Sequence, residues 1–212
     1  MLKKIKEKSI KKKRIAVFVS GRGTNMDNLA TKIEEGHIKK CEIALVFSDK
    51  PQALGLVKAK RKGLNTLCLE PKKFDSKLAH EKAIIAELEQ ARVDYIVLAG
   101  YMRILSSCII EKYKNKILNI HPSLLPSFKG AHGIKDAFDA GVKVTGVTVH
   151  FVTADLDGGP IIAQQAIEIF EGESLEKLEE RVHAVEYELY PRTLEMVLMG
   201  KTSVRKGKVF LK

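Results

Sequence analysis

Short apolar runs alternate with stretches of helical composition along the first half of the chain. Runs rich in Val, Ile and Leu predict buried strands at 15–19, 43–47, 95–99 and 117–120, with a weaker strand at 65–69. Composition and length predict helices between them, at 28–35, 53–62 and 76–90. Strand–helix–strand repetition at this spacing predicts an α/β fold, Rossmann-like in the loose sense, with a mostly parallel sheet and helices on both faces.

The second half of the chain has a different pattern. Residues 145–152 alternate apolar and polar, residues 161–170 form a second extended run, and a Gly-rich loop separates them. This arrangement is typical of paired strands, so we expect antiparallel strands to be added toward the C-terminus.

A last helix and a hairpin are expected after these strands. Ser174 is a good N-cap for a helix that we expect to end before Pro191. Residues 202–211 predict a small hairpin around Lys206-Gly207.

The positive charge is concentrated at the start of the chain. The 212 residues hold 37 Lys and Arg against 26 Asp and Glu, a formal charge of +11. Residues 1–14 carry eight basic residues and one acidic residue, hence +7, and the other 29 basic and 25 acidic residues leave +4. We expect a flexible basic extension at 1–13 before a single domain at 14–212. Such a run is usually solvated, and non-specific contact with polyanions is the alternative.

Composition excludes several other classes of protein. Hydrophobic residues at 45% and charged residues at 30% exclude a disordered, collagen-like or coiled-coil chain. No apolar run approaches the roughly 20 residues that cross a bilayer, so we expect no membrane association. Cys41, Cys68 and Cys108 lie far apart, without a CxxC motif or a Cys/His cluster, so we expect a cytoplasmic protein that binds no metal.

The first candidate site is Ser20-Gly21-Arg22-Gly23-Thr24-Asn25, where the first strand meets the first helix. Glycines permit a tight turn there, and the N–H groups of a helix start favour phosphate. No Gly-Lys-Ser/Thr follows, and Met26 stands at the third glycine position of the dinucleotide fingerprint. The loop therefore favours a phosphate monoester over NAD, with a ligand-free Gly-rich turn as the alternative.

The second candidate is Asn119-Ile120-His121-Pro122, at the end of a buried strand. Asn119 and His121 are two residues apart, so both side chains point to the same side of the sheet. The carboxyl ends of such strands are where ligands bind in open α/β sheets. Histidine transfers protons near neutral pH, and an amide can donate a hydrogen bond to a developing oxyanion.

The third candidate is the loop Thr153-Ala154-Asp155-Leu156-Asp157-Gly158-Gly159-Pro160. A carboxylate on this loop could lie beside His121 and favour the imidazolium form. Turn chemistry alone also explains Asp before two glycines.

Together with Leu-Ala-Gly-Tyr-Met-Arg-Ile-Leu at 98–105, these three motifs resemble the glycinamide ribonucleotide formyltransferase family, the folate-dependent formyltransferases of purine synthesis. The resemblance runs from about Arg14 to about Tyr190. It implies the formyltransferase fold and transfer of a formyl group from the co-substrate 10-formyltetrahydrofolate to the amine of glycinamide ribonucleotide.

The resemblance also implies roles for particular residues. Catalysis is implied for Asn119, His121 and Asp157, and ribonucleotide binding for Gly23, Thr24, Asn25 and Glu186. Folate binding is implied for Lys77, Met102, Arg103, Ile104, Leu105, Asn119, Thr153, Ala154, Asp155, Leu156 and Asp157.

Two positions depart from the pattern of the family. Lys77 stands where relatives often carry Arg, which weakens a planar bidentate contact with a carboxylate. Lys129-Gly130-Ala131-His132 stands where Pro-Gly-x-His is common, and His132 is kept as a candidate on the substrate side. We interpret His150 as structural and His37 as a cap or surface residue.

Three other functions stay open at this stage. Formyltetrahydrofolate deformylase and methionyl-tRNA formyltransferase share the catalytic half, but their usual additional domains do not fit the length of this chain. A basic-armed nucleotide- or RNA-binding protein without catalysis is the alternative from another class. The favoured hypothesis is an enzyme with two small-molecule substrates and no specific nucleic acid, as a monomer or homodimer.

Overall fold

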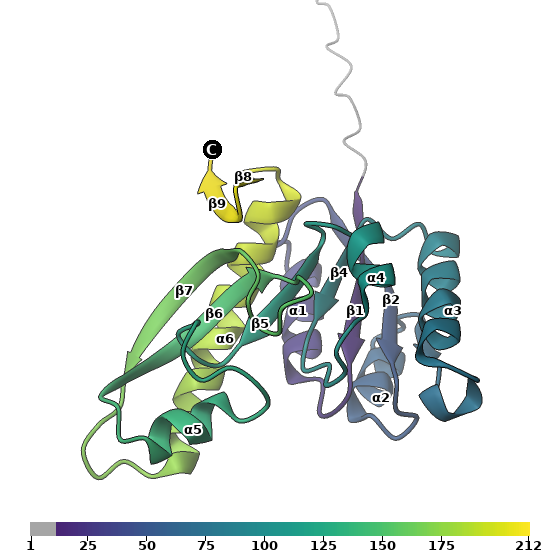
Figure 1. The fold of residues 1–212 in the computed structure, drawn as a ribbon. Helices are drawn as coiled ribbons and strands as arrows, with labels where there is room; N and C mark the ends of the chain where they lie inside the picture. Colours follow the sequence, from purple (N-terminus) through teal and green to yellow (C-terminus); the bar gives the residue numbers. More distant parts are fainter. Residues whose placement is uncertain (1–11) are drawn as a thin grey trace, which may run out of the picture.

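The computed structural model describes residues 12–212, so the predicted extension at 1–13 lies almost wholly outside the described residues. Seven strands form one sheet in the order β3-β2-β1-β4-β5-β6-β7 (Figure 1). The first five strands pair in parallel, as the apolar runs predict. They are β1 (Lys13–Val19), β2 (Cys41–Ser48), β3 (Thr66–Cys68), β4 (Tyr95–Leu98) and β5 (Ile117–His121).

Two antiparallel strands extend this sheet, which confirms the expected change of pattern. They are β6 (Val144–Phe151), which pairs with β5, and β7 (Ile161–Glu168), which pairs with β6. A separate C-terminal hairpin consists of β8 (Thr202–Arg205) and β9 (Lys208–Leu211). The turn falls at Lys206-Gly207, as predicted.

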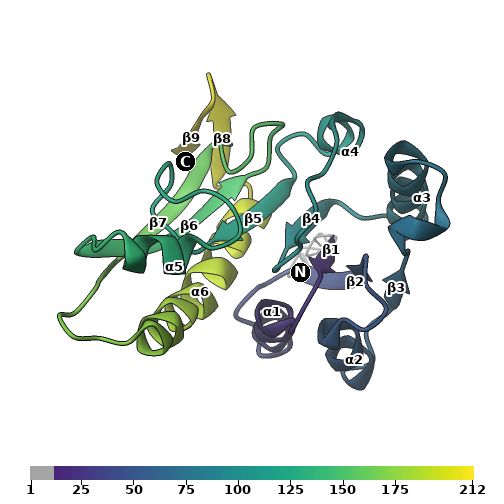
Figure 2. The same ribbon diagram turned by 60° about the horizontal axis from the view of Figure 1, so that its bottom comes forward.

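Helices cover both faces of the sheet (Figure 2). The side chains of β1 alternate between the two faces. Ile15 and Val17 pack with α1, α2 and α6 in one apolar cluster, whereas Ala16 and Phe18 pack with α3 and α4 in the other. The helices are α1 (Thr24–Glu34), α2 (Leu54–Arg61), α3 (Lys77–Gln90), α4 (Ser107–Lys112), α5 (Gly133–Asp139) and α6 (Leu175–Leu198), with a 3₁₀ turn at Pro71–Lys73.

The last long helix does not end before Pro191, so this prediction was wrong. Pro191 lies inside α6, which continues to Leu198. A proline lacks the N–H that would bond to the carbonyl four residues earlier, here that of Tyr187. The Asn28 side chain of α1 donates to that carbonyl instead, at 2.8 Å. A tertiary hydrogen bond thus satisfies the group that the proline leaves free.

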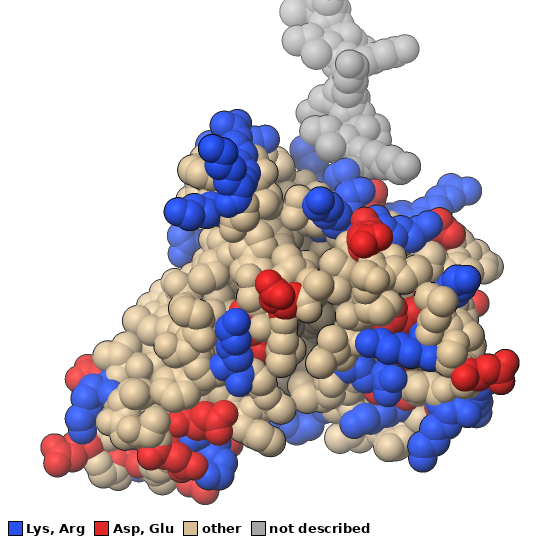
Figure 3. Space-filling model, in the orientation of Figure 1, with Lys and Arg blue, Asp and Glu red and all other residues tan. Residues whose placement is uncertain are grey.

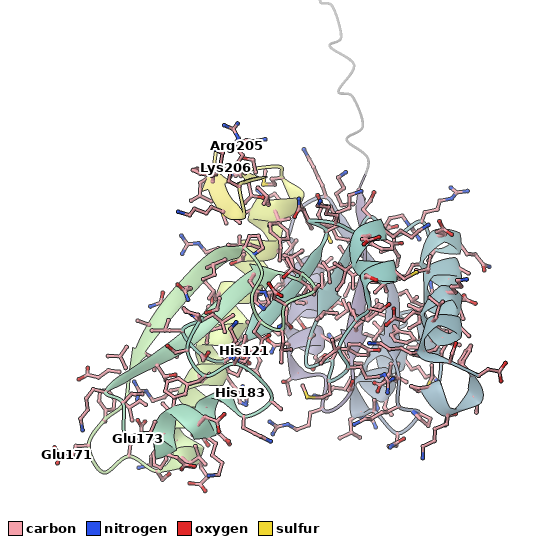
Figure 4. The ribbon with its side chains drawn as sticks, in the orientation of Figure 1. His121, Glu171, Glu173, His183, Arg205 and Lys206 are labelled. Atoms are coloured by element: carbon pink, nitrogen blue, oxygen red, sulfur yellow. The ribbon has the colours of Figure 1, made fainter. Side chains whose placement is uncertain are left out.

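Charged side chains gather at two ends of the domain (Figure 3). Lys and Arg cluster on the C-terminal hairpin, at the top of the view, where Figure 4 labels Arg205 and Lys206. Acidic side chains gather at the lower left, near Glu171 and Glu173 before α6. Within residues 12–212 no helix has both the length and the apolar character needed to cross a membrane.

Candidate active site

A cavity of about 890 Å³ opens at the C-terminal edge of the parallel strands. The sheet grows outward in opposite directions from the β1–β4 pair, and such a switch point leaves a crevice above the strands. Segments that follow β1, β4, β5 and β6 line the cavity, with one face of α6 and the start of α5: residues 20–25, 98–105, 119–122, 130–135, 152–157, Leu175, Glu179, His183 and Glu186 among them. All three motifs singled out in the sequence therefore meet here.

His121 ends β5 and is held from two sides. Its Nε2 donates to the carbonyl of Phe128 at 2.8 Å, and its Nδ1 lies 3.6 Å from Oδ2 of Asp157. Both side chains are nearly buried, at 5% and 8% exposure, so little water screens their interaction. A protonated ring can donate from both nitrogens, one toward the carboxylate and one toward an acceptor in the cavity.

His150 of β6 lies beside both Asn119 and the same carboxylate. Asn119 and His150 face each other in the β5–β6 register. Nδ1 of His150 donates to the Phe151 carbonyl at 3.0 Å, so the neutral ring has a free lone pair on Nε2. That atom accepts from the Asn119 amide at 3.2 Å and lies 3.7 Å from Oδ1 of Asp157. Burial lowers the pKa of His150, which favours this neutral, accepting form.

The loop that carries Asp157 folds back tightly on the end of β6. A Cβ at Gly159 would lie 1.8 Å from the Phe151 carbonyl, so only glycine fits there. Asp157 itself adopts a left-handed conformation, with φ of 48°, and its Oδ2 accepts from the Gly130 amide at 2.9 Å. Turn chemistry and placement of the carboxylate are therefore combined in one loop.

The glycine loop after β1 brings the start of α1 to the other end of the cavity. Gly23 caps α1 with φ of 66°, and a Cβ there would lie 2.4 Å from Cα of Gly55. Side chains are excluded at this contact, so the backbone itself borders the cavity. The first amides of α1 have no acceptors within the helix and are suited to an anion.

Three polar side chains meet beside this helix start. Oε2 of Glu186 accepts from Nδ2 of Asn25 and from Nδ1 of His183, each at 3.0 Å. The hydrogen bond to Glu186 raises the pKa of His183. Figure 4 labels His183 and His121, which come from α6 and β5 and line the same cavity.

An apolar wall forms another part of the cavity lining. Met102 and Ile104 are 62% and 60% exposed, and Leu156 is 52% exposed, although all three are large hydrophobic residues. They line the cavity, where they offer a surface to a flat ring system. The Met102 amide donates to Ser20 Oγ at 3.0 Å, which ties this wall to the glycine loop.

The structure places most of the predicted site residues around the cavity, but not all. Lys77 is the exposed first residue of α3 and is not one of the lining residues. His132 does line the cavity, at the start of α5. His150, interpreted as structural, contacts two of the predicted catalytic residues, Asn119 and Asp157. The pairing of Asn119 with His150 in the β5–β6 register explains the first contact. His183 was missed, and its spacing of three residues from Glu186 on one helix could have indicated it.

Fold and site together define an α/β enzyme whose cavity joins a phosphate-type loop to an amide, imidazole and carboxylate centre. The formyl transferase family matches residues 13–194, and the chain belongs to this family.

Individual relatives agree with this assignment. The chain is 44% identical to the phosphoribosylglycinamide formyltransferase of Bacillus subtilis over 186 residues, 88% of this chain and 95% of that protein. It is 43% identical to the trifunctional purine biosynthetic protein adenosine-3 of Gallus gallus, of which it spans 20%. The solved glycinamide ribonucleotide transformylase 1 of Symbiobacterium toebii superimposes with a TM-score of 0.91 at 40% identity, over 94% of each chain.

Proposed function

We propose that this protein transfers the formyl group of 10-formyltetrahydrofolate to the amine of glycinamide ribonucleotide, in purine biosynthesis. The products are formylglycinamide ribonucleotide and tetrahydrofolate. Membership of the formyl transferase family and 44% identity to a phosphoribosylglycinamide formyltransferase support this assignment. The observation that carries it is the single cavity that holds both a helix start suited to phosphate and the Asn119, His121 and Asp157 side chains.

In this proposal Asn119 and His121 stabilise the oxygen of the transferred group. The substrate amine attacks the formyl carbon, and the carbonyl oxygen gains negative charge as a tetrahedral intermediate forms. The Asn119 amide and the protonated His121 ring donate hydrogen bonds to that oxygen. In the structure, Nε2 of His121 donates to the Phe128 carbonyl. In the reaction the formyl oxygen replaces this carbonyl as the acceptor of that hydrogen bond.

Asp157 orients the His121 ring through this step. Its carboxylate lies 3.6 Å from Nδ1 of His121, where it stabilises positive charge on the ring. One proton leaves the attacking amine and one reaches N10 of the departing folate, so a single relayed proton balances the reaction. The new C–N bond to the acceptor replaces the C–N10 bond to the folate.

The two substrates occupy opposite ends of the cavity in this arrangement. The phosphate lies at the start of α1, at Gly23, Thr24 and Asn25, with Glu186 near the ribose. The folate lies along the apolar wall of Met102 and Ile104, between residues 102–105 and 153–157. Holding both substrates in reactive geometry supplies a large share of the acceleration, up to about 7–11 kcal/mol.

An acceptor competition tests this assignment. The purified protein is mixed with 10-formyltetrahydrofolate and, in separate reactions, glycinamide ribonucleotide, its dephosphorylated riboside, initiator methionyl-tRNA or no acceptor. We expect rapid tetrahydrofolate release only in the reaction that contains glycinamide ribonucleotide. Loss of the phosphate should lower kcat/KM roughly 10- to 100-fold, because a charge-assisted contact is lost. Equal turnover with tRNA, or with water as the only acceptor, would refute the proposal.

A further inference from the structure

The part of the apolar wall at residues 102–105 has few contacts of its own with the rest of the domain. Met102 and Ile104 are exposed, and of these four residues only Leu105 is buried. The amides of residues 103–105 form no hydrogen bond with any other described residue. The position of this wall therefore depends on how the chain is held at its two ends, Met102 and Ser106.

A buried carboxylate of α3 holds the Ser106 end. Glu81 is 3% exposed, and its Oε1 accepts from the Ser106 amide at 2.9 Å while its Oε2 accepts from the Ser106 hydroxyl. Ser106 is the N-cap residue of α4, but its hydroxyl caps no amide of that helix. Because α3 and α4 lie side by side on one face of the sheet, Glu81 fixes the start of α4 against α3 (Figure 2).

The Met102 end is held separately, through the glycine loop. The Met102 amide donates to Ser20 Oγ at 3.0 Å, and the Ser20 hydroxyl donates to Oδ1 of Asp49 at 2.6 Å. Asp49 directly follows β2 and is 6% exposed. A change at this end would also disturb the loop proposed to bind the phosphate, whereas Glu81 contacts only the far end of the wall and is not one of the cavity-lining residues.

We propose that Glu81 is a positioning residue for the folate, which fixes the wall at residues 102–105 through Ser106 without touching the substrate. The inference rests on the proposed function, which places the folate along this wall. Hydrogen bonds to a carboxylate are about twice as strong as those between neutral groups. A wall that is already fixed loses less conformational entropy when a ligand binds to it, so the Glu81 contact should favour folate affinity.

The test compares three variants with one matched control. Glu81→Ala removes both hydrogen bonds, and Ser106→Ala removes only the one to the hydroxyl. Glu81→Gln keeps the size of the side chain and can still accept from the Ser106 amide and donate to its hydroxyl, without a charge. Glu89→Ala is the control, because Glu89 also lies on α3 and pairs with Lys112 of α4, but is exposed and contacts the other end of α4.

Steady-state kinetics give kcat and the KM for each substrate, calorimetry gives the Kd for tetrahydrofolate, and hydrogen exchange is followed in peptides that cover residues 99–106. We expect Glu81→Ala to raise the folate KM and Kd about tenfold, because buried hydrogen bonds to a charged group are lost. Exchange at residues 102–106 should become faster. The KM for glycinamide ribonucleotide and kcat should stay within about twofold of the wild type, because the other end of the cavity is unchanged.

The remaining variants show whether Glu81 acts through Ser106. Ser106→Ala should raise the folate KM about threefold, and Glu81→Gln should stay within about threefold of the wild type. The double variant Glu81→Ala/Ser106→Ala should show less than the product of the two single effects, as residues in direct contact do. Glu89→Ala should match the wild type in every measurement.

The failures of the two proposals can be told apart. A wild type that binds tetrahydrofolate but transfers no formyl group contradicts the proposed function, and the comparison of folate affinities then decides on Glu81. Wild-type folate affinity in Glu81→Ala, or equal losses for both substrates, would overturn the role of Glu81. Where Glu81→Ala does not fold, Ser106→Ala decides, and an unchanged folate KM with unchanged exchange at residues 102–106 overturns the proposal.

Discussion

Replacement of Asp157 by Asn removes a charge from the centre of the site while it keeps the size of the side chain. The carboxylate lies 3.6 Å from His121 Nδ1, and both groups are nearly buried. At that separation two unit charges attract by about 4–5 kcal/mol for an effective dielectric constant near 20. An amide retains an acceptor for the Gly130 N–H, so the loop should keep its shape.

The expected result is a fall in kcat of roughly 100- to 1,000-fold, since each tenfold corresponds to about 1.4 kcal/mol of barrier. Only part of the full attraction is lost, because the surroundings of His121 rearrange around the changed charge. Steady-state release of tetrahydrofolate measures kcat, and calorimetry measures the affinity for the ribonucleotide, which should change little. Asp75→Asn, which removes an exposed carboxylate, is the control. A kcat of Asp157→Asn within about threefold of the wild type would show that this charge does not support His121.

Three further changes test other parts of the account. Gly23→Ala should lower the free energy of unfolding by about 1–3 kcal/mol and raise KM for the ribonucleotide more than it lowers kcat. The reason is that φ of Gly23 is 66° and the added Cβ would lie 2.4 Å from Cα of Gly55. Denaturant unfolding measures the first effect and steady-state kinetics the second. Tyr190→Phe should lower the free energy of unfolding by about 1–2 kcal/mol with near-normal turnover. The fully buried hydroxyl donates to the Leu98 carbonyl of β4 at 2.9 Å, and this hydrogen bond would be lost. An unchanged free energy of unfolding would contradict this. Deletion of residues 1–11 should leave formyl transfer unchanged and weaken salt-dependent retention on heparin. The nucleic-acid-binding alternative predicts instead that tight, salt-dependent binding of nucleic acid is the main activity and is lost with the deletion.

The parallel sheet could be predicted from the sequence because each strand is a short run of apolar residues with a distinct composition. The strand ends then indicated the candidate site, since parallel strands present their carboxyl ends at one edge. Asn119 and His121 could be placed on one side of that edge by strand periodicity alone. The sequence suggested that the Asp157 loop lies beside His121, but not how closely the two groups approach, which depends on the close packing of Gly159 against β6.

What the sequence could not give depends on contacts between distant segments. Pro191 predicts a helix end by local rules, and the helix continues because Asn28, far away in the chain, satisfies the freed carbonyl. The same holds for Glu186, whose donor Asn25 is 161 residues away. Local pattern determines which elements form, whereas the orientation of side chains between elements follows from packing.

The central claim is that Asn119 and His121 stabilise the developing oxyanion without contributing much to substrate affinity. The most direct measurement is single-turnover formyl transfer by Asn119→Ala and His121→Ala, with the affinity for glycinamide ribonucleotide measured on the same preparations. Loss of one such donor costs about 3–4 kcal/mol, so the rate of the chemical step should fall roughly 100- to 1,000-fold while the Kd stays within a few-fold of the wild type. A near-normal rate in either variant, or a loss explained entirely by weaker ribonucleotide binding, would contradict the account.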